Sequence, residues 1–102
     1  MPFGKIKVEY IYDLIIEKLQ IENYDERKDA VGDTLYEFFE IFIPQYGINT
    51  SNGVFKDSYL CAKFTGILLD TSAANLLKII LNNNTLIETL KYLLAKLIEN
   101  KT

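Results

Sequence analysis

The sequence predicts an all-α protein, a compact bundle of about five helices with one longer loop between the second and the third. Apolar residues recur at intervals of three and four along most of the chain, as on the buried face of a helix. Only two prolines and five glycines interrupt the 102 residues. This length and pattern suit a single helical domain, residues 1–102.

The first two helices are predicted from their apolar stripes. The first stripe consists of Val8, Ile11, Tyr12, Ile15, Ile16 and Leu19. The second consists of Val31, Leu35, Phe38, Phe39 and Phe42. Residues 1–5 are expected to be a frayed lead-in, and Asn23 with Glu26 forms a capping box that opens the second helix. Pro44 is expected to end this helix, because proline disfavours helical geometry at the preceding residue, Ile43.

Residues 47–57 are rich in turn formers and predict a loop, the one segment long enough for a flexible excursion. A short strand through Val54 and Phe55 would have no obvious partner. The third helix follows, with one apolar face made of Leu60, Cys61, Phe64, Ile67 and Leu68.

The chain ends in a short fourth helix and a longer fifth helix. Thr71 or Ser72 can cap the fourth helix, and residues 82–84, all asparagine, are expected to end it. Thr85 with Glu88 predicts a second capping box at the start of the fifth helix. The buried stripe of that helix is Leu86, Leu90, Leu93, Leu94 and Leu97.

Charge and composition argue against several functions. The net charge is −3 and Arg27 is the only arginine, so the clustered cations that bind nucleic acid are missing. No apolar run approaches the roughly 18–20 residues of a membrane span. A single cysteine, Cys61, permits no intrachain disulfide, which fits a cytoplasmic location.

Catalysis, cofactors and metals are not expected. The chain has no histidine, the commonest general base and metal ligand. Cys61 lies on an apolar helical face and is interpreted as a small core residue. Glu37 and Glu40 lie one helical turn apart, and the simplest interpretation is a solvated helix face.

Gly66 is the most informative residue, because it interrupts an apolar helical octet at residues 63–70, Lys-Phe-Thr-Gly-Ile-Leu-Leu-Asp. A glycine inside a helix costs about 0.5–1 kcal/mol relative to alanine. Close packing of the backbone or a ligand lying on the helix can offset this cost.

The octet resembles the Lys-Ile-Thr-Gly-Met-Leu-Leu-Glu signature of the MLLE domain, also called PABC, at the C-terminus of poly(A)-binding proteins. Lysine, threonine, glycine and both leucines are kept. Residues 32–36, Gly-Asp-Thr-Leu-Tyr, are similar to Gly-Glu-Arg-Leu-Phe on the family's second helix, and the resemblance covers about residues 27–98. Extra residues around 47–57 and a longer first helix make the chain resemble a divergent member.

The resemblance implies a non-enzymatic module that binds short peptide motifs of translation, deadenylation or mRNA-decay factors. It implies no direct contact with nucleic acid or membrane, and a monomer is expected. Family peptides wrap around the third helix, with Gly66 in the signature beneath them, and bury a phenylalanine between helices two and three and a leucine between helices three and five.

Carried over by position, the phenylalanine pocket would comprise Gly32, Tyr36, Ala62 and Lys63. The leucine pocket would comprise Thr65, Ile67, Leu68, Leu93 and Lys96. Gly32 would let the incoming ring lie against bare backbone, and the stem of Lys63 would cover it. Ala62 stands where the family has glycine.

A structural or oligomerising helical domain is the alternative interpretation. The long apolar first helix and the loop at Val54 and Phe55 would then be contact surfaces, or the extra segments would block the groove. Detection of a dimer would favour this alternative.

Overall fold

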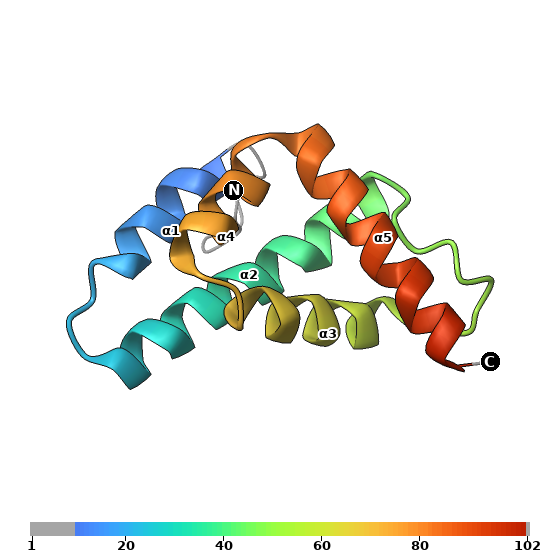
Figure 1. The fold of residues 1–102 in the computed structure, drawn as a ribbon, viewed down its shortest axis with the longest axis horizontal. Coiled ribbons are helices and arrows are strands. Elements are labelled where there is room, and N and C mark those ends of the chain that lie inside the picture. Colours follow the sequence, from blue (N-terminus) through green and yellow to red (C-terminus); the bar gives the residue numbers. More distant parts are fainter. Residues whose placement is uncertain (1–9, 102) are drawn as a thin grey trace, which may run out of the picture.

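The computed structural model describes residues 10–101, which form five α-helices joined by short turns and one longer loop (Figure 1). The helices are α1 (Ile11–Leu19), α2 (Tyr24–Gln45), α3 (Asp57–Leu69), α4 (Ala73–Leu81) and α5 (Asn83–Lys101). The predicted all-α fold with about five helices is confirmed. Val8 and residues 1–5, which entered the prediction of the first helix, lie outside the described residues.

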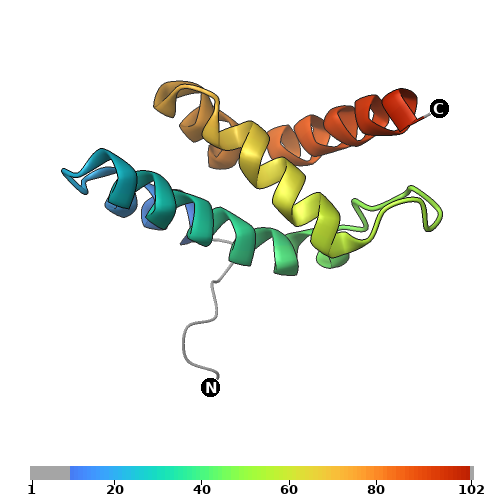
Figure 2. The ribbon, with the colours of Figure 1, turned by 90° about the horizontal axis from the view of Figure 1, so that it is seen from below.

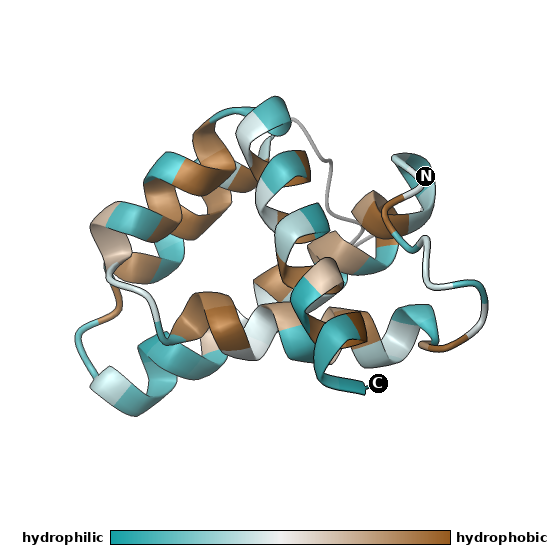
Figure 3. Cartoon of the chain, turned by 45° about the vertical axis from the view of Figure 1, so that its right-hand side comes forward, coloured by the Kyte–Doolittle hydropathy of each residue, from teal (hydrophilic) through white to brown (hydrophobic). Residues whose placement is uncertain are grey.

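The central helix of the arrangement is α3, which packs against α2 on one side and contacts α5 on the other. Figure 2 shows α3 running diagonally between these two helices. The short helices α1 and α4 pack on each other at the opposite end of the molecule from the loop (Figure 1). There α1 also packs on α2, and α4 packs on α5. Apolar residues lie on the faces that the helices turn toward one another, and polar residues cover the outside (Figure 3).

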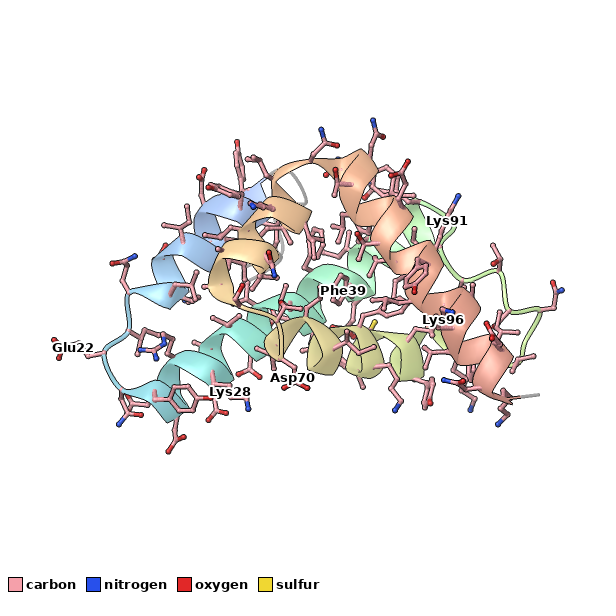
Figure 4. All side chains as sticks on the ribbon, in the orientation of Figure 1. Glu22, Lys28, Phe39, Asp70, Lys91 and Lys96 are labelled. Atoms are coloured by element: carbon pink, nitrogen blue, oxygen red, sulfur yellow. The ribbon has the colours of Figure 1, made fainter. Side chains whose placement is uncertain are left out.

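Four phenylalanines form the centre of the core. Phe38, Phe39 and Phe42 lie on one face of α2, Phe64 lies on α3, and all four are fully buried. The rings of Phe39 and Phe64 meet edge to face, with centroids 5.9 Å apart. Phe39 lies in the middle of the molecule (Figure 4). Burial of each such side chain contributes about 1.5–3 kcal/mol, so this cluster fixes α3 on α2.

Side-chain caps start α2 and α4 as the sequence leads one to expect. The Asn23 side chain accepts a hydrogen bond from the backbone N–H of Glu26 at 2.9 Å, which is one of the two hydrogen bonds of the predicted capping box. At α4 the cap is Ser72, one of the two candidates, whose hydroxyl accepts from the N–H of Asn75 at 3.2 Å. Each cap satisfies an N–H that the first helical turn leaves without a partner.

The start of α5 differs from the prediction. Its first residue is Asn83, so the predicted capping box at Thr85 and Glu88 is wrong, and so is the expectation of a three-asparagine break. The side chain of Asn82 accepts from the N–H groups of Asn84 and Thr85, at 2.8 and 3.3 Å. Asn82 alone therefore separates α4 from α5, because its side chain accepts hydrogen bonds from N–H groups in the first turn of α5 that have no partner within the helix.

The end of α2 also differs. Pro44 lies inside the helix, so the expectation that it ends the helix at Ile43 is wrong. The bias against helix before a proline is overcome here, because Ile43 is buried and the next turn closes firmly. Ile48 donates to the carbonyl of Ile43 at 3.0 Å, and Gly47 donates to that of Pro44 at 3.4 Å. Gly47 has a φ of 60°, so this is the Schellman arrangement that glycine favours.

The loop between α2 and α3 is ordered around the side chain of Asn49. Its amide donates to the Phe55 carbonyl at 2.9 Å and to the Asp57 carboxylate at 2.8 Å. Its oxygen accepts from the hydroxyl of Ser51 at 2.7 Å, and that hydroxyl accepts from the N–H of Phe55 at 3.0 Å. The loop therefore holds Phe55 in the core, and Val54 and Phe55 do not form a strand.

Replacing Asn49 by alanine tests this loop. We expect Asn49→Ala to lower the free energy of unfolding by about 1–3 kcal/mol, because the carbonyl of buried Phe55 and the hydroxyl of buried Ser51 lose their hydrogen bonds to Asn49. Urea denaturation followed by circular dichroism measures the change. Thr50→Ala, at the exposed neighbouring position, is the control and should shift stability by less than about 0.5 kcal/mol. Equal effects of the two substitutions would contradict the central role of Asn49.

Candidate functional site

A depression of about 320 Å³ lies on the seam between α2 and α3. It is lined by Lys28, Asp29, Gly32, Asp33 and Tyr36 of α2 and by Ala62, Thr65 and Leu69 of α3. The structure thus brings together Gly32, Tyr36 and Ala62, three of the four residues predicted for the phenylalanine pocket. The fourth, Lys63, lines the neighbouring hollow at the start of α3.

Gly32 forms the floor of this depression and lets α3 approach α2. A Cβ atom at Gly32 would lie 3.1 Å from Cδ1 of Leu69 and 3.9 Å from Cγ2 of Thr65. These two side chains occupy the space that was expected to receive an incoming ring. A ligand would therefore lie on Leu69 and beside Gly32, and would not rest on the bare backbone.

Gly66 has the opposite surroundings. It is exposed, and beyond its two chain neighbours and the adjoining backbone of α3 itself, a Cβ atom there would meet no described atom within 4 Å. Packing within residues 10–101 therefore does not offset the cost of this helical glycine. Ala62 lies one turn earlier on the same exposed face. Because these two residues have small or no side chains, a peptide segment that crosses the outer face of α3 there can contact the helix backbone.

Thr65 lies on the α2 side of α3. Its side chain is only 8% exposed, and its hydroxyl has no hydrogen-bond partner among the described residues. Thr65 therefore does not face α5 in the leucine pocket for which it was predicted. An unpaired buried hydroxyl costs about 1–3 kcal/mol, so Thr65 lowers the stability of the domain.

The other residues predicted for the leucine pocket are spread over the α3–α5 side. Leu68 is 1% exposed and belongs to the core, so it does not form an open pocket wall. Ile67 and Leu93 are half-buried. Lys96 is exposed on α5 (Figure 4), with its ammonium 3.8 Å from a carboxylate oxygen of Glu99 and 5.5 Å above the ring of its own helix's Tyr92.

The depression continues beyond both of its ends along α3. Toward the α3–α4 turn it adjoins a hollow of about 550 Å³, which shares Lys28 and Leu69 with it. Lys28 and Asp70 both line this hollow, and they lie near each other in Figure 4. Toward the loop it adjoins a hollow of about 810 Å³, which shares Tyr36. We call these three adjoining hollows the α3 groove.

Sequence reasoning missed several residues of the depression, namely Lys28, Asp29, Asp33 and Leu69. Those on α2 recur at helical spacing before and after Gly32 and Tyr36. Helical spacing from Gly32 and Tyr36 therefore could have identified these α2 residues, but only after Gly32 was known to lie between α2 and α3.

Cys61 offers no nucleophile at neutral pH. Its side chain is 1% exposed, and burial raises the pKa of the thiol to about 11, with further contributions from the negative charges of Glu40 and Asp57. In the described part of the chain, no three histidine, cysteine or acidic side chains are placed to hold a metal ion. The α3 groove can therefore act on a ligand through the shape and the charge of its walls.

The contact surfaces invoked by the structural alternative are partly used inside the molecule. Ile11 and Ile15 of α1 are buried, and so is Phe55, whereas Val54 is 48% exposed. The depression remains open to solvent, with an exposed Lys28 and Asp29 on its rim, and residues 10–101 do not cover it.

Comparison of the chain with protein-family models, with curated proteins and with solved structures found no match. The likeness to MLLE domains therefore rests on the residues of the octet and on the order of the helices. No helix within residues 10–101 has the length and apolar character needed to cross a membrane.

The open space at Gly66 makes a prediction about stability. We expect Gly66→Ala to raise the free energy of unfolding by about 0.5–1 kcal/mol, because the helix gains propensity and the methyl group meets no neighbour. Thermal unfolding measures this change. Gly32→Ala is the comparison, and the 3.1 Å contact with Leu69 should remove the gain there. A destabilised Gly66→Ala variant would contradict the free space at this position.

The unpaired hydroxyl of Thr65 makes a second prediction. We expect Thr65→Val to raise the free energy of unfolding by about 1 kcal/mol, because valine keeps the shape and removes the unsatisfied group. Thr34→Val is a matched control, since Thr34 is also buried but donates to the Ala30 carbonyl at 2.8 Å. The control should gain nothing. Urea denaturation of both variants checks the difference, and equal changes would mean that the Thr65 hydroxyl is satisfied.

Proposed function

We propose that this chain is a peptide-binding module of the MLLE type, without enzymatic activity. It binds short linear motifs such as those of translation, deadenylation or mRNA-decay factors, in the cytoplasm. The single observation that carries this proposal is Gly66, a helical glycine exposed on α3 one turn after Ala62, which lines the seam depression.

Gly66 matters because two reasons commonly offset a glycine inside a helix. Backbone packing is one of them, and it is absent at Gly66 within the described residues. A ligand that lies across the helix is the other. The lysine, threonine, glycine and leucines of residues 63–70, which resemble the MLLE signature, point to the same use of this face.

The seam depression suits an aromatic anchor. Its volume of about 320 Å³ lies at the lower end of the range for ligand pockets. The half-buried Tyr36 and Leu69 supply an aromatic and an aliphatic surface. Burial of one apolar anchor contributes about 1.5–3 kcal/mol, and the ordering of a flexible peptide offsets part of it. Two anchors contribute about 3–6 kcal/mol before this offset, so the expected micromolar Kd, about 8 kcal/mol, also requires contacts of the peptide backbone with the groove.

Amide chemical shifts test the proposal directly. The ¹⁵N-labelled chain is titrated with a peptide that carries leucine and phenylalanine anchors at the family's spacing. We expect saturable shifts that cluster at Gly32, Tyr36, Ala62 and Gly66. A peptide in which serine replaces both anchors is the control and should cause none. The absence of shifts at millimolar anchored peptide would refute the proposal.

A substitution at Gly66 separates binding from stability. Gly66→Ala should weaken the anchored peptide at least about threefold, because the methyl group lifts the peptide from the helix, although the free domain becomes more stable. Asn75→Ala, on the exposed face of α4, also improves helix propensity and should leave binding unchanged. Isothermal titration calorimetry measures both affinities. Unaltered affinity of Gly66→Ala would exclude a peptide that crosses α3 at this residue.

A further inference from the structure

The hollow at the start of α3 differs in charge from the rest of the α3 groove. Its walls come from the loop, the first two turns of α3 and the end of α5, and Tyr36 joins it to the seam depression. Lys56, Lys63 and Lys101 line it, and none of its lining residues is an aspartate or a glutamate. The chain as a whole carries a net charge of −3, so positive charge is concentrated here.

An aromatic platform lies between these lysines. The ring of Tyr59 stacks on that of Phe55, with centroids 5.1 Å apart and planes inclined by 13°. Phe55 is buried, whereas Tyr59 is 42% exposed. The ammonium of Lys63 lies 5.9 Å from the centre of the Tyr59 ring. Because the loop fixes Phe55 through Asn49, the platform is already formed without a ligand.

The three lysines are available to a ligand. All three are exposed, and within residues 10–101 none of them forms an ion pair with a carboxylate. Asp57 follows Lys56 directly, and its carboxylate accepts a hydrogen bond from Asn49 on the loop. Glu99 lies two residues before Lys101, and a carboxylate oxygen of Glu99 is 3.8 Å from the ammonium of Lys96.

We propose that this hollow binds an acidic segment of the peptide that occupies the seam depression. The inference rests on the proposed function, because the segment reaches the hollow past Tyr36, next to the aromatic anchor. The first two turns of α3, residues 57–63, extend about 10 Å, which is the length of about three extended residues. Three carboxylates face the three lysines, and the aliphatic parts of the segment pack on Tyr59.

A short acidic peptide fits the groove better than a nucleic acid does. A strand that continued along α3 would meet two carboxylates, Asp29 and Asp33, and a single cation, Lys28, in the seam depression. A continuous chain of phosphates would be repelled there, whereas a peptide places its acidic residues only where the lysines are. The loop that builds this hollow is also the segment by which the chain departs from the MLLE pattern.

Calorimetry with three peptides tests the inference. All three carry the same leucine and phenylalanine anchors. The first has three glutamates before the phenylalanine, the second has three glutamates after it, and the third has glutamines in place of the glutamates. We expect one acidic peptide to bind about 3- to 20-fold more tightly than the glutamine peptide at low ionic strength. This ratio should fall below about twofold in 0.5 M salt.

Two double variants locate the effect. K56Q/K101Q should lower the preference for glutamate to about twofold or less, because only Lys63, which was predicted for the anchor pocket, is left to face the segment. K78Q/K91Q removes the same charge from exposed positions on α4 and α5 and should keep the preference. Lys91 lies near the middle of α5 (Figure 4), ten residues before Lys101.

The outcomes separate this inference from the proposed function. Equal affinity of acidic and glutamine peptides overturns the inference and leaves the peptide-binding module standing. Failure of all three peptides to bind at millimolar concentration overturns both. A ten-nucleotide oligothymidine that binds more tightly than the acidic peptide, and loses affinity in K56Q/K101Q, would assign the lysines to nucleic acid and refute the inference.

Discussion

The packing of α2 against α3 is the contact on which the rest of the molecule depends. It combines a buried phenylalanine cluster with the close approach that Gly32 permits. Because α2 holds α3 along one side and α5 contacts it on the other, α3 keeps one outer face free. The seam depression and the hollows at its two ends follow the same helix. The position of the groove therefore follows from the packing of α2 and α5 against α3.

The two helical glycines show how far a sequence carries the description of this site. Helical periodicity predicted the helices and their buried stripes, glycine inside a helix marked Gly66, and the resemblance of residues 32–36 to the MLLE pattern marked Gly32. What faces each glycine depends on the neighbouring helix, which periodicity does not reveal. The structure corrects the expectation for Gly32, which receives Leu69 and Thr65 from α3, and of the two reasons considered for Gly66 it shows no close packing, because this glycine faces open space. Prediction of the fold was thus better than prediction of the pocket walls.

The irregular segments were harder to predict than the helices for a physical reason. Turn-forming residues indicated the loop, but its conformation depends on the specific partners of Asn49, among them a carbonyl six residues away. An aromatic residue, Phe55, in a polar stretch was the available sign that the loop returns to the core. The starts and ends of helices shifted likewise, because Asn82 caps α5 alone and a closed turn keeps Pro44 helical.

The burial of Cys61 has a practical consequence for studies of this seam. Its thiol lies on the inner face of α3, close enough to α2 for Glu40 to affect its pKa. A thiol reagent reaches the sulfur only when α3 separates locally from its neighbours. As the only cysteine, it labels at a rate that reads out how often the seam opens. The rate at which Cys61 reacts in the native chain therefore measures how often α3 separates from α2, without an introduced probe.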